Sequence, residues 1–150
     1  MRGIRFHADG AREPLESLAG VLAALAARRA EMAARPVGDI LDLLADFSGR
    51  LLRDPATKGL EGAMFLSAWL RRPNLEKMLA LNLGDRVEAL DGFVAQGRDY
   101  LAARPRGLVV MWMAGNVPTL PAFSFVPALL AKNVALVKLA DPEPAGMDAI

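Results

Sequence analysis

The sequence predicts an α/β fold in which a helical region leads into the first βαβ unit of a parallel sheet. Between residue 15 and about residue 100, apolar residues recur at intervals of three and four, which indicates amphipathic helices. From Leu108 onward, short continuous apolar runs replace that pattern, as in strands covered on both faces of a parallel sheet. We therefore expect residues 1–104 to form a helical lead-in and residues 105–150 to begin an incomplete α/β domain.

The helical region is predicted from four apolar stripes, and residues that start or stop helices flank them. These stripes are Leu15–Leu25, Val37–Leu51, Met64–Trp69 and Leu75–Leu83. Pro36 suits the start of the second helix because that position needs no N–H donor, and Asn74 is expected to cap the fourth. Asp85, followed three residues later by Glu88, is typical of a capping box and predicts a further helix over Arg86–Gly97.

The α/β part is predicted from a strand, loop, helix and strand in that order. We expect Leu108–Met113 and Val134–Lys138 to be neighbouring parallel strands, joined by a helix over Ala122–Ala131 with a right-handed crossover. Asn133 is expected to end that helix in the left-handed conformation. Trp112 lies in the first apolar strand, and we expect it, like Trp69 in the third helix, to pack in the core.

Ligands of such units bind beyond the carboxyl ends of the strands. The loops Ala114–Pro118 and Leu139–Pro144 emerge at that edge. Gly115 with Asn116 makes a turn that lets the backbone approach a ligand closely, and Lys138 ends a strand there with an ammonium that suits an anionic or hydroxyl-rich ligand. The alternative is that the lysine only reaches for water and the asparagine only shapes the turn.

Composition argues against several classes of function. A net charge of +1 gives no bulk attraction for nucleic acid or for an anionic membrane. Without cysteine, the chain has no disulfide, thiolate metal site or cysteine nucleophile of its own, and the single histidine, His7, gives no support for a catalytic triad or a histidine metal site. Pro118, Pro121 and Pro127 interrupt the uncharged run Gly107–Ala131, so no membrane span is expected. We find no typical secretory signal and expect a cytoplasmic location.

The segment RGLVVMWMAGNVPTLPAFSFVPALLAKNVALVKLADPEP resembles the acyl-CoA reductases of bacterial bioluminescence, the LuxC family of the aldehyde dehydrogenase superfamily. In that family a Gly-led strand is followed by an Asn-containing turn before a proline, then by a helix and a KN…VVK strand. The segments PVGDILDLLADFSGRLL and LDGFVAQGRDYLAARPRG are also similar to the helical lead-in of the family. The resemblance extends from about residue 35 to residue 144.

The resemblance implies roles for the turn between the first strand and the helix. Asn116 matches the asparagine whose side-chain amide helps to form an oxyanion hole, where a donor stabilises negative charge that develops on the acyl oxygen. Met113, Ala114 and Gly115 match the backbone that lines the nicotinamide side of the cofactor cleft. Gly115 stands where the wider superfamily has an aromatic residue, as it does in the acyl-CoA reductase branch.

The resemblance also implies that residues 105–150 begin an aldehyde-dehydrogenase-like nucleotide-binding sheet, and with it a nucleotide cofactor. Lys138 matches the strand-end lysine that hydrogen-bonds the adenosine ribose, and Asp141 stands where the superfamily has a glutamate for the same ribose. An acid near the ribose 2′ position disfavours a 2′-phosphate, whereas the family favours NADPH. We take NADP(H) as the implied cofactor and NAD(H) as the alternative.

The implied function is the cofactor-binding N-terminal part of a fatty acyl-CoA reductase, which reduces an acyl thioester to an aldehyde. Members of the family attack acyl-CoA with a cysteine that lies C-terminal to the lysine strand, so this chain alone is expected to be inactive. The remainder of the same polypeptide or a partner chain would supply the cysteine. The alternative is a non-catalytic helical interaction module that keeps a relic βαβ unit and associates through an unpaired strand edge. The sequence leaves the oligomeric state and the acyl chain length open.

Overall fold

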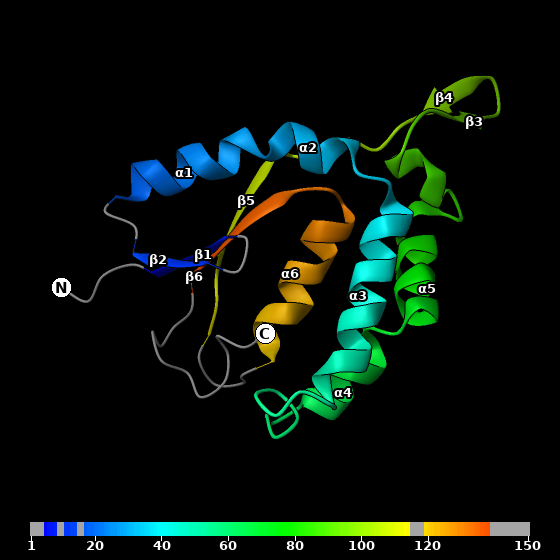
Figure 1. The fold of residues 1–150 in the computed structure, drawn as a ribbon. Coiled ribbons are helices and arrows are strands. Elements are labelled where there is room, and N and C mark those ends of the chain that lie inside the picture. Colours follow the sequence, from blue (N-terminus) through cyan, green and yellow to red (C-terminus); the bar gives the residue numbers. More distant parts are fainter. Residues whose placement is uncertain (1–4, 9–10, 15–16, 115–118, 139–150) are drawn as a thin grey trace.

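The protein forms an α/β structure in which helix α6, Leu120–Leu130, lies between a pair of parallel strands and a group of helices (Figure 1). The computed structural model describes residues 5–8, 11–14, 17–114 and 119–138. The helices are α1 Leu18–Ala27, α2 Arg29–Ala34, α3 Val37–Leu51, α4 Ala63–Trp69, α5 Arg72–Leu83, the 3₁₀ turn η1 Val87–Leu90 and α6 Leu120–Leu130. The strands are β1 Arg5–Ala8, β2 Ala11–Pro14, β3 Val94–Gln96, β4 Asp99–Leu101, β5 Leu108–Trp112 and β6 Val134–Lys138.

The predicted parallel pair is confirmed. β5 and β6 run parallel in a register that places Leu108 opposite Val134 and Trp112 opposite Lys138. β5 ends one residue earlier than predicted, although the N–H of Met113 still donates to the carbonyl of Lys138 at 3.0 Å. Helix α6 connects the two strands, as expected, and contacts β6 on one face of the pair.

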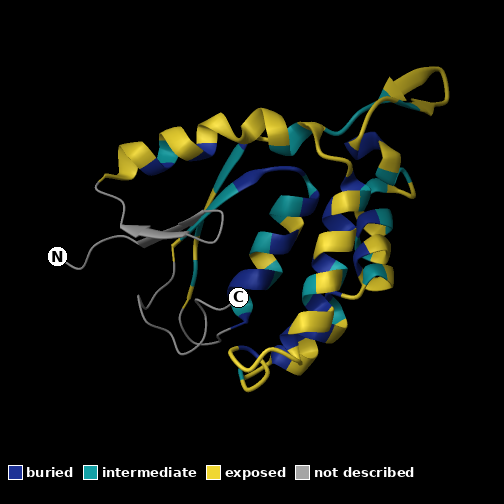
Figure 2. Cartoon of the chain, viewed as in Figure 1, coloured by how far each residue is buried: buried dark blue, intermediate teal, exposed yellow. Residues whose placement is uncertain are grey.

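The main core lies where α3, α4, α5 and α6 meet. Figure 2 shows buried residues along the facing sides of α3, α5 and α6. Leu51, Leu66, Leu70 and Leu75 have almost no exposed surface. Each such side chain stabilises the fold by about 1.5–3 kcal/mol relative to an exposed one. This core joins the helical region to the crossover helix, so the two predicted parts of the chain share their packing.

The predicted cap of the fourth helix is wrong. Helix α5 begins at Arg72, and Pro73 occupies its first turn, where a missing N–H costs nothing. Asn74 therefore lies inside the helix. Its side-chain amide donates to the carbonyl of Ala68 at the end of α4, at 2.8 Å, instead of accepting from a helix N–H.

The helix predicted over Arg86–Gly97 is also wrong. Gly84 and Asp85 both adopt the left-handed conformation, with φ of 60° and 59°, whereas a helix N-cap normally has extended backbone. A short 3₁₀ turn follows, and then the antiparallel hairpin β3–β4. Its two-residue turn begins with Gly97 at φ 63°, which glycine adopts without strain. Antiparallel pairing of β1 with β2 adds a second hairpin that the sequence did not predict.

Candidate functional site

The carboxyl edge of the β5–β6 pair carries those predicted site residues that the structure describes. Met113 and Ala114 directly follow β5, and Lys138 is the last residue of β6. The parallel register brings the ends of both strands to the same edge. Gly115, Asn116 and Asp141 lie outside the described residues.

Lys138 and Trp112 form a pair at this edge. They are directly opposite in the parallel register, so both side chains leave the same face of the sheet. The ammonium of Lys138 lies 5.9 Å from the centroid of the indole ring, which is within the range of a cation–π contact. Trp112 is 76% exposed, so the prediction that it packs in the core is wrong. Trp69, by contrast, packs against the main core, as predicted.

Incomplete cover of this sheet face explains the exposure of Trp112. Helix α1 buries Val21 and Leu25 against Val134 at the beginning of the strands. It does not extend over the carboxyl half, where Val110 is 50% exposed. A continuous apolar run predicts a strand buried on both faces, but the helix that covers this face reaches only half of it. The uncovered half presents an aromatic ring and a cation side by side.

The far end of the predicted turn is fixed by contact between α4 and α6. Thr119, the residue just before α6, is buried and lies against Gly62, the residue just before α4. Gly62 has a φ of 81°, and a Cβ atom there would be only 2.7 Å from the hydroxyl of Thr119. Only a residue without a side chain allows this approach. Residues 115–118 therefore connect two anchored points, the end of β5 and Thr119.

The other end of α6 is anchored by two adjacent polar residues whose positions the sequence did not predict. Lys132, not Asn133, adopts the left-handed conformation after α6, with φ of 58°, so the predicted left-handed cap at Asn133 is wrong. The buried side chain of Asn133 instead accepts from the N–H of Gly107 at 3.0 Å and donates to the carbonyls of Ala128 and Ala131 at 3.2 Å. It thereby connects the end of α6 to the residue before β5.

Lys132 is the buried lysine of this unit, with a side chain that is only 3% exposed, whereas Lys138 is exposed. Its ammonium donates to a carboxylate oxygen of Asp91 at 2.5 Å. The same oxygen accepts from the N–H of Val37 at the start of α3, at 2.9 Å. One carboxylate thus caps α3 and neutralises the cation behind α6. The two residues are 41 positions apart, so no local sequence pattern indicates the contact.

Surface charges also connect α5 to α3. The guanidinium of Arg72 donates to Glu76 at 2.8 Å and pairs with Asp42 on α3. The hydrogen bond that the guanidinium donates to Glu76, followed by that to Asp42, raises the pKa of Arg72 above its ordinary value. Because all three side chains are largely exposed, this network contributes little to stability.

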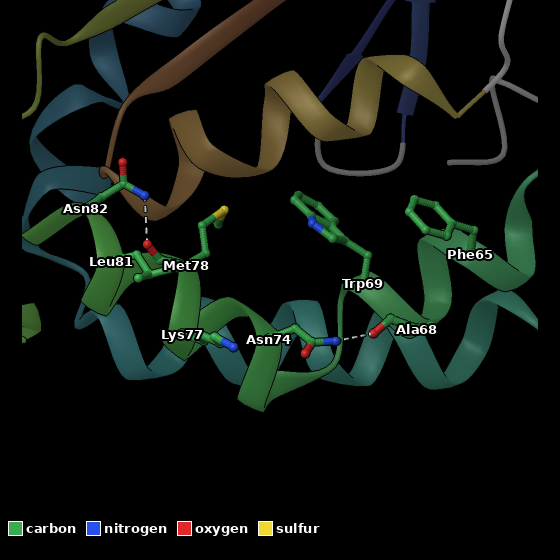
Figure 3. Close-up of a pocket in the computed structure, with 8 residues that line it drawn as sticks. All are labelled: Phe65, Ala68, Trp69, Asn74, Lys77, Met78, Leu81 and Asn82. Atoms are coloured by element: carbon green, nitrogen blue, oxygen red, sulfur yellow. Dashed lines mark hydrogen bonds between the residues drawn. The ribbon is translucent and has the colours of Figure 1, made fainter.

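A groove of about 430 Å³ lies between α4 and α5 (Figure 3). Phe65, Ala68 and Trp69 of α4 line it together with Met78 and Leu81 of α5. Phe65 and Trp69 also contact Phe123 of α6, with ring centroids 5.7 and 4.7 Å apart. The stripe pattern predicted the helices that form the groove, but not that an apolar surface between them stays open.

The described residues contain neither a cluster of metal-binding side chains nor a helix suited to cross a membrane. Across residues 17–114 and 119–138, no three side chains of the types that bind metal gather into a site. Within the part of the chain that the structure describes, no helix combines the length and apolar character that a membrane crossing requires.

Known proteins provide an independent comparison. The sequence profile of the family described as acyl-CoA reductase (LuxC) matches residues 32–150. The chain is 33% identical over 64 residues to a long-chain acyl-protein thioester reductase of Aliivibrio fischeri, and 34% identical over 70 residues to one of Photobacterium phosphoreum. These matches span 43% and 47% of this chain but only 13% and 14% of the relatives. No solved structure matches the chain. The profile covers most of the sequence, and the chain therefore belongs to the LuxC family of acyl-CoA reductases.

Proposed function

We propose that this chain is the cofactor-binding part of an enzyme that reduces an acyl thioester to an aldehyde with NADPH. The observation that carries the proposal is the parallel β5–β6 pair, which presents Met113 and Lys138 at one carboxyl edge in a member of the LuxC family. Both relatives named above are long-chain acyl-protein thioester reductases, which supports an acyl thioester as the substrate class.

The exposed carboxyl half of the sheet fits a dinucleotide. Lys138 is exposed and leaves the sheet on the half of that face that α1 does not cover, beside the open ring of Trp112. An ammonium can donate to ribose hydroxyls or to a phosphate. In the proposal Lys138 holds the adenosine ribose, with Asp141 on the same ribose, and the backbone of Met113, Ala114 and Gly115 lines the cleft. When bound, NADP(H) supplies the hydride that reduces the acyl group.

Asn116 is the proposed oxyanion donor. In the sequence it lies between the end of β5 and Thr119, two points that backbone pairing and the contact with Gly62 hold in place. Anchors at both ends favour a pre-positioned donor, which lowers the cost of stabilising a developing oxyanion. The attacking thiolate has to come from residues beyond these 150, because the sequence contains no cysteine.

Replacement of Lys138 tests the cofactor role. In the longest natural polypeptide that carries this chain, Lys138→Ala should weaken NADPH binding by roughly tenfold to a hundredfold, because a charge-assisted hydrogen bond contributes about 1.5–3 kcal/mol. Affinity for acyl-CoA should change little. Lys58→Ala, at an exposed loop lysine, is the matched control. Fluorescence titration with NADPH and NADH measures both affinities. Unchanged affinity for both cofactors in Lys138→Ala would show that this lysine has no part in cofactor binding.

A helical interaction module is the second candidate. It is favoured by the exposure of Val110 and Trp112 on a sheet that, among the described residues, has only two strands. Such a surface suits association with another chain. The same titration separates the two candidates, because an interaction module has no reason to bind NADPH through Lys138.

A further inference from the structure

The groove between α4 and α5 presents large apolar side chains to solvent. Phe65 is 67% exposed and Leu81 is 76% exposed, one near each end of the groove. Contiguous apolar surface of this kind is uncommon on a protein that has nothing to bind there. Figure 3 shows the side chains of Phe65, Trp69 and Met78 in a row along α6, whereas Lys77 points away from that helix. The groove thus has an apolar wall beside α6 and a polar outer rim.

One end of this groove lies toward Thr119, the residue that follows the proposed catalytic turn in the sequence. Phe65 is in the first turn of α4, and the preceding Gly62 contacts Thr119. Thr119 is three residues after Asn116 in the sequence. Phe65 also contacts Phe123, which is in the first turn of α6. An extended ligand in the groove can therefore point one end toward Thr119 and the other toward Leu81.

We infer that this groove binds the aliphatic chain of the acyl thioester, with the carbonyl carbon toward Thr119 and the methyl end toward Leu81. This inference rests on the proposed function, which makes an acyl thioester the substrate. An alkyl chain needs no hydrogen-bond partner. The wall formed by Phe65, Trp69 and Met78 is correspondingly apolar, and its one strong hydrogen-bonding group is the indole N–H. The names of the relatives, which specify long-chain acyl groups, agree with a groove that extends away from the turn.

Filling the groove tests the inference. The side chain of Ala68 is exposed between Phe65 and Trp69, and only its backbone carbonyl accepts the hydrogen bond from Asn74. Ala68→Leu therefore occupies the groove without disturbing the core. Ala24→Leu, at an exposed alanine of α1, is the matched control.

The assay compares kcat/KM for acyl-CoA substrates from butanoyl to tetradecanoyl in the longest natural polypeptide. In the unmodified enzyme, each added CH₂ should raise kcat/KM by up to about fourfold where it becomes fully buried, and by about twofold where one side faces water. Ala68→Leu should lower kcat/KM for tetradecanoyl-CoA roughly tenfold and leave butanoyl-CoA within about twofold. Ala24→Leu should match the unmodified enzyme. An unchanged dependence on chain length in Ala68→Leu, or an equal loss at every length, would overturn the inference.

A second measurement needs no turnover. Trp69 lines the groove, so 12-bromododecanoic acid, whose bromine quenches indole fluorescence on contact, should quench its emission. A Trp112→Phe background removes the signal of the other tryptophan in this chain, and subtraction of a Trp69→Phe variant isolates the wanted emission. Quenching that Ala68→Leu abolishes supports the groove even if no thioester is reduced, in which case only the proposed function fails. Reduction of acyl-CoA without quenching of Trp69 overturns the groove alone and indicates that it is covered by protein.

Discussion

Removal of the buried ammonium of Lys132 should cost less stability than removal of the charge on its partner, Asp91. The two side chains differ in exposure, at 3% for Lys132 and 41% for Asp91. Lys132→Met keeps most of the aliphatic stem and leaves behind a carboxylate that water reaches and that still accepts from Val37. We expect this variant to lose about 1–2 kcal/mol of unfolding free energy, less than the cost of breaking a fully buried pair.

Asp91→Asn removes the negative charge of the pair and leaves the positive one. The amide oxygen can still cap Val37, but the ammonium of Lys132 remains buried without a neutralising charge. We expect a loss of about 3 kcal/mol, since an uncompensated buried charge carries most of its desolvation cost. The double variant removes that imbalance. Its loss of unfolding free energy should be smaller than the sum of the two single losses by about 1 kcal/mol or more.

Urea unfolding followed by circular dichroism measures the unfolding free energies of the unmodified protein, the two single variants and the double variant. The slope of the unfolding free energy against urea concentration should stay constant, so that midpoints report stability. Lys58→Met, at an exposed lysine, is the control for loss of a positive charge. The reasoning is refuted if Lys132→Met destabilises the protein more than Asp91→Asn does, or if the two effects are additive.

Two further predictions concern the proposed oxyanion turn and its anchor. Asn116→Asp and Asn116→Gly should each lower turnover by roughly a hundredfold or more while cofactor affinity changes little, because the amide acts on charge that develops in the transition state. Single-turnover acylation by an acyl-CoA measures that step. Near-normal acylation in the glycine variant would mean that the asparagine only shapes the turn. Gly62→Ala should lower the unfolding free energy by about 2 kcal/mol, because alanine at φ 81° is strained and its Cβ meets the hydroxyl of Thr119. Thermal unfolding of Gly62→Ala with and without Thr119→Ala, which removes that hydroxyl, measures the clash. An unchanged melting temperature in Gly62→Ala would contradict the prediction.

Patterns that extend over a few neighbouring residues predicted much of this fold. The parallel strands followed from continuous apolar runs, and most helices followed from stripes at three-and-four spacing. The failures came from backbone conformation and from distant contacts. Asp85 resembles a capping residue in sequence, but its left-handed backbone prevents that role. The burial of Lys132 could not be predicted, because its partner Asp91 lies far away in the sequence.

The candidate site could be predicted only in outline. The carboxyl edge with Lys138 followed from strand order, and the structure places Met113 and Ala114 at the same edge. The exposure of Trp112 did not follow, since it depends on how far α1 extends over the sheet. The chemical roles of these residues remain predictions from the family resemblance. The open groove also depends on how two helices pack, which a single amphipathic stripe does not specify.

The side chain of Asn133 makes separate parts of the βαβ unit depend on one another. It holds the N–H of Gly107 before β5 and two carbonyls in the last turn of α6, while the carbonyl of Gly107 accepts from Val134 at the start of β6. Loss of any one of these contacts loosens the others, so fraying of the helix and separation of the strands become a single opening event. In hydrogen exchange, the amide protons of Gly107 and Val134 should then share one opening free energy.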